Sequence, residues 1–240
     1  MDSPHNPTLN RLLAELPETE LAQLRPHLQR VHLELGRVLY EPGRQATHLY
    51  FPIDCVISKI CLLLDGSSAE TAVVGKEGVV GIALFMGDGT TSTRMVVQVA
   101  GDAYRLSGKL MKDEFYRSRD LQQVLLRYVQ ALLAQMGQTA ICNRHHTIEQ
   151  QLCRWLLESL DRLPTNEVNM TQELIAGMLG VRREGVTAAA RKLSRDGIIS
   201  YHRGCIIVND RQGLEARCCE CHEVVRKEYD RLQRGLKHLQ

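Results

Sequence analysis

Arg182 and Arg183 begin a stretch whose residue types suit the reading of DNA bases. The planar guanidinium of arginine can bind both hydrogen-bond acceptors on the major-groove edge of a guanine. Arginine near the start of a helix is therefore what base reading requires. Val186 and Leu193 recur on the expected buried side, and Gly197 ends the pattern. The stretch predicts a helix that fits a DNA major groove.

The residues before it predict a first helix and a tight turn. Thr171 can cap this helix through its side-chain oxygen, and Glu173 favours the positive end of the helix dipole. Gly180 supplies the turn, where a backbone without Cβ is least strained. Apolar residues at helical spacing form the predicted buried face: Leu174, Ile175, Met178 and Leu179. Together the two helices predict a helix-turn-helix.

A small hairpin follows directly. Residues 198–201 and 205–208 predict two short strands joined by a turn, which makes the motif a winged helix-turn-helix. A wing usually lies along a phosphate backbone, so Arg203 at its tip is a candidate phosphate contact. Residues 182–203 hold six Lys or Arg against two acidic residues, a local excess of +4, whereas the whole chain is +2. This concentration of charge favours DNA binding over the alternative, a merely solvated helix face.

Length and composition set the broad class. A chain of 240 residues is long enough for about two domains, and 44% hydrophobic and 24% charged residues are ordinary for a globular protein. No apolar run approaches the roughly 18 residues of a membrane span. The N-terminus lacks a signal pattern, so the eight cysteines are expected to be reduced thiols in a cytoplasmic protein that does not contact membranes.

The rest of the chain predicts an α+β protein. Short β-prone runs between residues 31 and 106, with turn signals about every 8–12 residues, predict an N-terminal β-barrel or jelly roll. We divide the chain into a barrel-type sensor domain at 9–110, a dimerisation helix at 111–146, a winged helix-turn-helix domain at 147–225 and a charged tail at 226–240. A hinge is expected at 143–147.

The helix at 111–146 carries an apolar stripe. Its members follow at alternating spacings of three and four, with Met136 beside them: Leu121, Leu125, Tyr128, Leu132, Gln135 and Thr139. The stripe predicts pairing with a second copy of the chain, because DNA readers of this type bind two half-sites with two subunits. The alternative is a helix packed on its own domain.

The order of barrel, glycine-rich loop, long helix and winged helix-turn-helix resembles the CRP/FNR family of bacterial transcription regulators over residues 10–225. The firmest anchors are residues 171–173, Gly180 and residues 183–186, which resemble the family's R-E-x-V recognition-helix start. The resemblance implies that Arg183 binds guanine and that Glu184 accepts from a cytosine amino group.

The resemblance is incomplete at the DNA-reading end. The family's second base-reading arginine falls at Ala188, and the candidates to replace it are Arg182, Thr187 and Arg191. The preferred DNA site therefore need not be the family's usual half-site. The predicted DNA contacts are Thr171, Gln172, Arg182, Arg183, Glu184, Thr187, Arg191 and Arg203.

The sensor end departs further from the cyclic-nucleotide members. Their phosphate-binding cassette resembles G-E-x-x-L-F followed by an Arg-Ser pair, but here Ile82 holds the glutamate position and residues 91–92 fall near the arginine position. Losing both charged partners costs on the order of several kcal/mol, so cyclic AMP is not the expected ligand. The candidate effector-pocket residues are Gly81, Ile82, Ala83, Leu84 and Arg94. The effector is unknown, no cofactor is predicted, and an empty structural remnant is the alternative.

Other residues of the chain are of types that bind metals, respond to redox or catalyse reactions. Cys218, Cys221 and His222 would share a helix face and could bind zinc or respond to redox, but a fourth ligand has no predicted place, so no metal is predicted. No cysteine precedes Cys55, which excludes the N-terminal iron–sulfur cluster of the family's oxygen-sensing branch on ligand count. The sequence has no nucleophile–base pair, nucleophile elbow or Walker loop, so an enzyme is not expected.

The sequence thus predicts a homodimeric transcription regulator that binds double-stranded, palindromic DNA and contacts RNA polymerase. The alternative is a signalling module that binds a small molecule or partner protein through its barrel and binds DNA weakly or without sequence preference. An enzyme built on the barrel is a more distant alternative, opposed by the absence of the H-x-H metal ligands that such barrels use.

Overall fold

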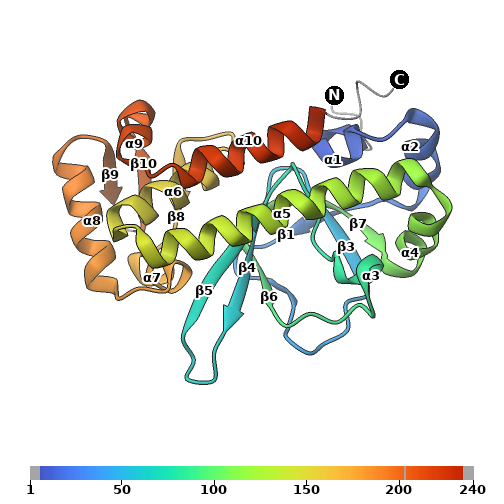
Figure 1. Ribbon diagram of the computed structural model, residues 1–240, viewed down its shortest axis with the longest axis horizontal. Coiled ribbons are helices and arrows are strands. Elements are labelled where there is room, and N and C mark those ends of the chain that lie inside the picture. Colours follow the sequence, from blue (N-terminus) through green and yellow to red (C-terminus); the bar gives the residue numbers. More distant parts are fainter. Residues whose placement is uncertain (1–5, 203, 235–240) are drawn as a thin grey trace.

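The computed structural model describes residues 6–202 and 204–234. An N-terminal sheet domain and a C-terminal domain of helices with a small sheet are joined by one long helix (Figure 1). Among the described helices, none combines the length and the apolar character needed to cross a membrane.

Short helical segments precede the sheets: η1 (Pro7–Leu9), α1 (Arg11–Ala14), α2 (Glu18–Leu24) and η2 (Arg25–His27). Asn10 begins α1 by accepting a hydrogen bond from the Leu13 amide. Its side-chain amide also donates to the carbonyls of Pro52, at 2.9 Å, and Gly78, at 3.0 Å. This buried asparagine therefore links the N-terminal segment to the sheets and to the glycine-rich loop, residues 75–81.

The N-terminal strands form two antiparallel sheets. One has the order β1-β7-β3, from β1 (Gln29–Leu33), β3 (His48–Pro52) and β7 (Gly101–Ser107). The other has the order β2-β6-β4-β5, from β2 (Val38–Tyr40), β4 (Val56–Leu62), β5 (Ser68–Val74) and β6 (Arg94–Val99). The predicted α+β class is confirmed, and the sheets are jelly-roll-like rather than a closed barrel.

Three helices follow or flank these strands: α3 (Ala83–Met86), α4 (Gly108–Arg117) and α5 (Arg119–His145). The helix expected from residue 111 is interrupted at Ser118, whose backbone is extended and whose hydroxyl caps α5 by accepting from the Leu121 amide at 3.2 Å. A side chain that competes for backbone donors in this way favours a helix start over a helix interior.

The C-terminal domain contains α6 (Ile148–Leu160), β8 (Glu167–Asn169), α7 (Gln172–Leu179), α8 (Arg183–Arg195), β9 (Ile199–His202), β10 (Cys205–Val208) and α9 (Arg211–Arg217). Its strands pair in the order β8-β10-β9. A separate core lies between α6, α7, α8 and this sheet, with Trp155, Leu156 and Leu193 at its centre. The domain therefore has an apolar core of its own.

The last described helix, α10 (Cys221–Arg234), returns along α5 (Figure 1). Val225 and Tyr229 are buried in the core of the N-terminal domain, and the Tyr229 hydroxyl donates to the Gln135 side chain at 3.1 Å. The described part of the predicted charged tail, residues 226–234, is thus a helix packed on the rest of the chain.

The predicted dimer stripe does not fit this structure. Its side chains lie in the core of the single chain, between 0 and 4% exposed, for Leu121, Leu125, Tyr128, Leu132, Gln135 and Thr139. Met136 is partly buried against the same core. The physical reason is that the sheets and α10 together cover this side of α5. The apolar period therefore identified the side of the helix that packs within the same chain.

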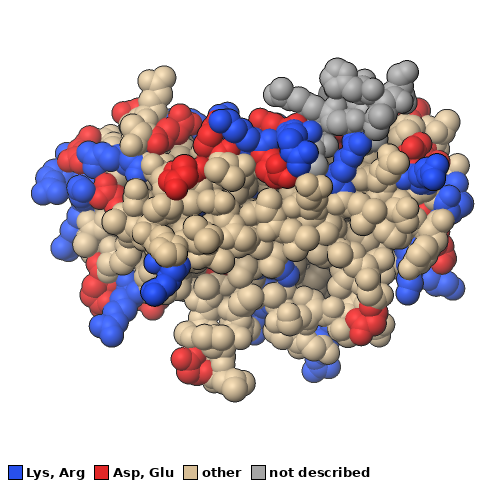
Figure 2. Space-filling view, viewed as in Figure 1, with Lys and Arg blue, Asp and Glu red and all other residues tan. Residues whose placement is uncertain are grey.

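The opposite side of α5 is exposed and also apolar. Leu126, Leu133 and Ile141 are 48%, 61% and 53% exposed, and exposed Gly137 and Ala140 lie between them in sequence. The molecular surface over α5 is largely without charged side chains (Figure 2). An exposed apolar ridge of this kind is typical of a surface that meets another protein.

Candidate nucleic-acid interface

The helix-turn-helix is set by two local features at the ends of α7. Thr171 begins the helix, and its side-chain oxygen accepts a hydrogen bond from the Leu174 amide at 3.3 Å. Gly180 ends it with φ +67°, a left-handed conformation that favours glycine. A Cβ at Gly180 would also lie 3.2 Å from the Cβ of Ala69. The structure therefore places the helix cap and the turn at the residues predicted for them, Thr171 and Gly180.

The second helix, α8, has one buried and one exposed side. Val186, Ala189, Ala190 and Leu193 are buried. The other side carries four of the predicted DNA contacts, namely Arg183, Glu184, Thr187 and Arg191. Arg183, Glu184 and Arg191 are exposed, so this face can enter a groove without any change in the domain core.

The remaining predicted contacts have different surroundings. Arg182 is exposed and occupies the N-cap position of α8. The Thr187 hydroxyl donates to the Gln172 side chain at 2.6 Å, which joins α7 to α8. Thr171 is exposed but uses its hydroxyl as the helix cap. Arg203, predicted at the tip of the wing, lies outside the described residues, although β9 and β10 do pair as a hairpin on either side of it.

Charge on this face is only loosely neutralised. The Arg183 Nε lies 3.8 Å from a Glu173 carboxylate oxygen, and both side chains are well exposed, so the pair contributes little and can be exchanged for a ligand. Within the described residues, neither Arg182 nor Arg191 makes an ion pair. The guanidinium groups predicted to read DNA thus remain accessible.

A second group of ion pairs links α6, α8 and α9 within the domain. Glu149 accepts from Lys192 at 2.6 Å and from Arg217 at 3.0 Å, and Arg217 also contacts Asp196 at 2.7 Å. Burial alone would raise the pKa of the Glu149 carboxyl, but the hydrogen bonds from Lys192 and Arg217 outweigh it and lower that pKa. Lys192 and Asp196 therefore serve the domain itself, whereas the arginines of the exposed face are left for a partner.

The predicted effector residues are packed among the chain's own side chains. Gly81 has φ +111°, and a Cβ there would lie 2.6 Å from the Tyr40 hydroxyl. Ile82 is partly buried and precedes α3, and Leu84 is buried within it. The Arg94 Nε lies 2.9 Å from a Glu41 carboxylate oxygen. The cation that could meet a phosphate here already has a carboxylate partner.

Several side-chain hydrogen bonds join the N-terminal domain to the C-terminal domain, among them one from Gln98 of β6 to the Ser159 hydroxyl of α6 at 3.3 Å. The Ser68 hydroxyl of β5 donates to the Gly177 carbonyl of α7 at 3.2 Å. The buried Arg162 side chain, just after α6, donates from Nε to Glu77 of the glycine-rich loop at 2.7 Å. No motif in the sequence indicated the Arg162–Glu77 pair, because its partners lie 85 positions apart.

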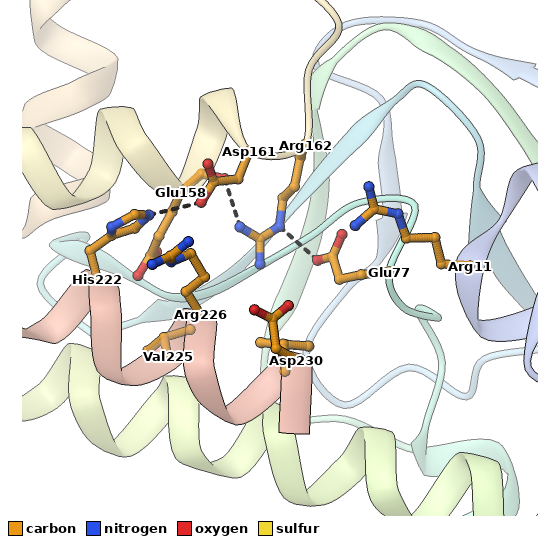
Figure 3. A pocket seen from close by; sticks show the side chains of 10 residues that line it. Arg11, Glu77, Glu158, Asp161, Arg162, His222, Val225, Arg226 and Asp230 are labelled. Atoms are coloured by element: carbon orange, nitrogen blue, oxygen red, sulfur yellow. Dashed lines mark hydrogen bonds and ion pairs between the residues drawn. The ribbon is translucent and has the colours of Figure 1, made fainter. Parts of the chain in front are cut away.

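The Arg162 pair borders a cavity of about 240 Å³ between the loop, α6 and α10. Arg162 lies between Glu77 and Glu158, and Arg11 approaches Glu77 from the N-terminal segment (Figure 3). Arg162 also donates to the Glu158 carbonyl at 2.6 Å. Burial disfavours its charge, but Glu77 outweighs this and raises the pKa of Arg162. The cavity has both acids and bases around it, so the arginine is satisfied without a ligand.

The three residues considered as metal ligands in the sequence, Cys218, Cys221 and His222, are not brought together. His222 turns to Asp161, with Nε2 2.8 Å from a carboxylate oxygen, whereas Cys221 faces His146 at 3.4 Å (Sγ to Nδ1). The sequence predicts that Cys218 and Cys221 share a helix. In the structure Cys221 begins α10, whereas Cys218 lies in the connection between α9 and α10. The trio is therefore wrong as a ligand set.

The cap, the turn, the exposed helix α8 and the β9–β10 hairpin define a winged helix-turn-helix domain. Residues 150–217 match the Crp-like helix-turn-helix domain family. No curated protein matches the sequence.

Solved structures resemble most of the chain in fold. A proposed CRP/FNR-family transcriptional regulator from Eubacterium rectale has a TM-score of 0.69 and 16% identity, over 90% of this chain and 99% of its own. FixK2 from Bradyrhizobium japonicum has a TM-score of 0.69 and 17% identity, over 80% of this chain and 98% of its own. A CRP/FNR-family transcriptional regulator from Thermus thermophilus has a TM-score of 0.64 and 19% identity, over 81% of this chain and 98% of its own.

The predicted resemblance is thereby confirmed. Residues 150–217 are a Crp-like helix-turn-helix domain, and the chain as a whole has the fold of the CRP/FNR transcription regulators. These two neighbours are described as transcriptional regulators.

Proposed function

We propose that this protein is a CRP/FNR-type transcription regulator that acts as a homodimer on palindromic DNA. The observation that carries the proposal is the exposed face of α8, where Arg183 and Glu184 stand at the start of a recognition helix supported by its own core. Arginine to guanine and glutamate to cytosine are pairings that read sequence rather than backbone charge. RNA polymerase stays a proposed partner, to be tested by transcription in vitro.

Arg183→Ala tests the DNA-reading role. In selection from a random DNA pool, the wild type should enrich a two-fold symmetric motif. The variant should lose preference at one base per half-site and about 1–3 kcal/mol of specific binding. Arg37→Ala is the matched control, because Arg37 is an exposed arginine of the sensor domain. If no motif is enriched even at low salt, where phosphate contacts are strongest, the partner-binding alternative replaces this proposal.

The proposed dimer uses the exposed ridge of α5 rather than the predicted stripe. Leu126, Leu133 and Ala140 are seven residues apart, the repeat of two helices that pair side by side. A Cβ added at Gly137 would meet nothing within 4 Å, so a second helix could approach closely there. Pairing would bury apolar side chains that are exposed in a single chain.

Leu133→Glu should therefore weaken the dimer. A two-fold interface buries the substitution twice, and an unpaired buried charge is costly, so the dissociation constant should rise at least about 100-fold. Sedimentation velocity across a concentration series would measure it. Leu64→Glu is the control, because Leu64 is fully exposed in the β4–β5 turn, away from α5. Equal dimerisation of wild type and Leu133→Glu would place the interface elsewhere.

We further propose that the sensor domain is degenerate toward cyclic AMP. The glutamate position of the cassette holds Ile82, and Arg94 is paired with Glu41. Regulation would act through the contacts of β5 and the glycine-rich loop with the DNA-binding domain, and change the angle at residues 143–147. A dimer that binds its operator equally under every ligand and redox condition would argue against such switching.

A further inference from the structure

Four side chains that could hold a metal meet where the two domains join. Cys142 and His146, four residues apart in sequence, come from the end of α5, and Cys219 and Cys221 come from the segment that begins α10. Their ligand atoms all lie within 4.8 Å of one another. The three cysteines are buried and His146 is largely so. Distant parts of the chain have thus placed three thiols and one imidazole around one point.

The spacing suits a tetrahedral zinc ion. Zinc–sulfur and zinc–nitrogen bonds of about 2.3 and 2.0 Å place tetrahedral ligand atoms roughly 3.5–3.8 Å apart. The Cys142 and Cys219 sulfurs are 3.6 Å apart, and the Cys221 sulfur is 3.4 Å from His146 Nδ1. Two edges of the tetrahedron are therefore within about 0.2 Å of the length that a bound ion requires.

We propose that Cys142, His146, Cys219 and Cys221 bind one Zn²⁺ as a closed structural site. Four protein ligands complete a tetrahedron and leave no position for a substrate, which is the pattern of structural rather than catalytic zinc. The site would fasten the last turn of α5, next to the proposed hinge, to the start of α10.

Surrounding groups support the proposal independently. The second ring nitrogen of His146 lies 3.6 Å from the Glu220 carboxylate, and metal-binding histidines usually have such a carboxylate behind them. Gln138 donates to the Cys221 sulfur and Arg154 to the Cys142 sulfur, both at 3.2 Å. These donors would stabilise thiolates, while the Arg154 cation is also paired with the buried Glu158 carboxylate at 3.1 Å.

The competing interpretation is a redox switch that joins Cys142 to Cys219. The Cys142 and Cys219 sulfurs are 3.6 Å apart, well beyond the roughly 2.05 Å of a disulfide bond. A disulfide would also leave the convergence of Cys221 and His146 on the same point without a role.

Metal analysis of the full-length protein, purified under reducing conditions without chelator, tests the proposal. We expect about one zinc per chain. After removal of zinc, Co²⁺ should give the visible absorption of tetrahedral thiolate coordination. Cys219→Ser should weaken zinc binding by more than about 100-fold, since even the loss of a group behind a ligand costs 10–100-fold. Cys218→Ser is the matched control, adjacent in sequence but not a ligand, and should keep the zinc.

Three results would overturn the proposal. One is wild-type protein that neither contains zinc nor gives the cobalt spectrum, which requires no variant to fold. Another is equal zinc content in wild type and Cys219→Ser, which places the metal elsewhere. The third is a Cys142–Cys219 disulfide in aerobically purified protein whose reduced form fails to bind either ion, which would establish the redox interpretation.

Discussion

Replacing Arg162 by alanine should lower the free energy of unfolding by about 3–5 kcal/mol. Arg162 and Glu77 form an ion pair with side chains only 7% and 10% exposed, and a Nε–Oε1 distance of 2.7 Å. Removal of the arginine leaves the Glu77 carboxylate buried with its cation gone, retaining only the Gly75 amide at 3.1 Å among its described donors. Because the pair joins the glycine-rich loop to the end of α6, the loss should also loosen the domain junction.

Urea denaturation of the purified variants would measure this. The control is Arg25→Ala, which removes a pair with Glu18 of similar length, 2.9 Å, but with side chains 44% and 71% exposed. An exposed pair contributes below about 1 kcal/mol. The double variant Glu77→Gln/Arg162→Met should recover much of the lost stability, since no unpaired charge remains. If Arg162→Ala costs no more than Arg25→Ala, the buried pair does not hold the junction.

The Glu70→Gln variant should remove a pH dependence of stability. Glu70 lies on β5, is 5% exposed, and one of its carboxylate oxygens has no hydrogen-bond partner among the described residues. Burial raises the pKa of this carboxyl from an ordinary 4.5 to about 7; Ser58 opposes that rise, and the nearby Glu158 adds to it. The folded protein therefore favours the neutral acid.

The sign follows from proton uptake. Between pH 4.5 and about 7 the folded chain keeps a proton at Glu70 that the unfolded chain has lost. The stabilising contribution is thus complete below pH 4.5, falls as pH rises through this window, and is absent above about pH 7. The total change is about 3 kcal/mol, at about 1.4 kcal/mol per pKa unit. Glutamine stays neutral throughout, so the variant should gain that much relative to wild type across the window.

Unfolding free energies of both proteins at pH values from below 4.5 to above 7 would show the difference. Subtraction of the two curves cancels the contributions of all other groups that the substitution leaves unchanged. Glu34→Gln serves as the control because Glu34 is exposed, and its difference from wild type should stay flat. A flat difference for Glu70→Gln as well would mean that the Glu70 carboxyl is already ionised in the folded protein.

The DNA-reading motif could be predicted because its signals are local. The cap at Thr171, the left-handed turn at Gly180 and the arginines at the start of α8 lie within one stretch, residues 171–183, and each acts on its own helix. Backbone geometry and the 3.6-residue period therefore determine them before any distant contact forms. The α+β class likewise follows from the order of β-prone and helical runs.

Only the tertiary structure decided what each apolar or reactive group faces. The stripe through Leu125 and Leu132 showed that one side of α5 is buried, but not that the sheets and α10 bury it. An amphipathic period indicates burial and is silent about the partner. Cys142 and Cys219, 77 positions apart, meet only because α10 folds back along α5, and Arg162 meets Glu77 only because the domains are in contact. The sequence by itself determined the helices, turns and recognition residues, whereas the joints between domains depend on long-range contacts that no local pattern encodes.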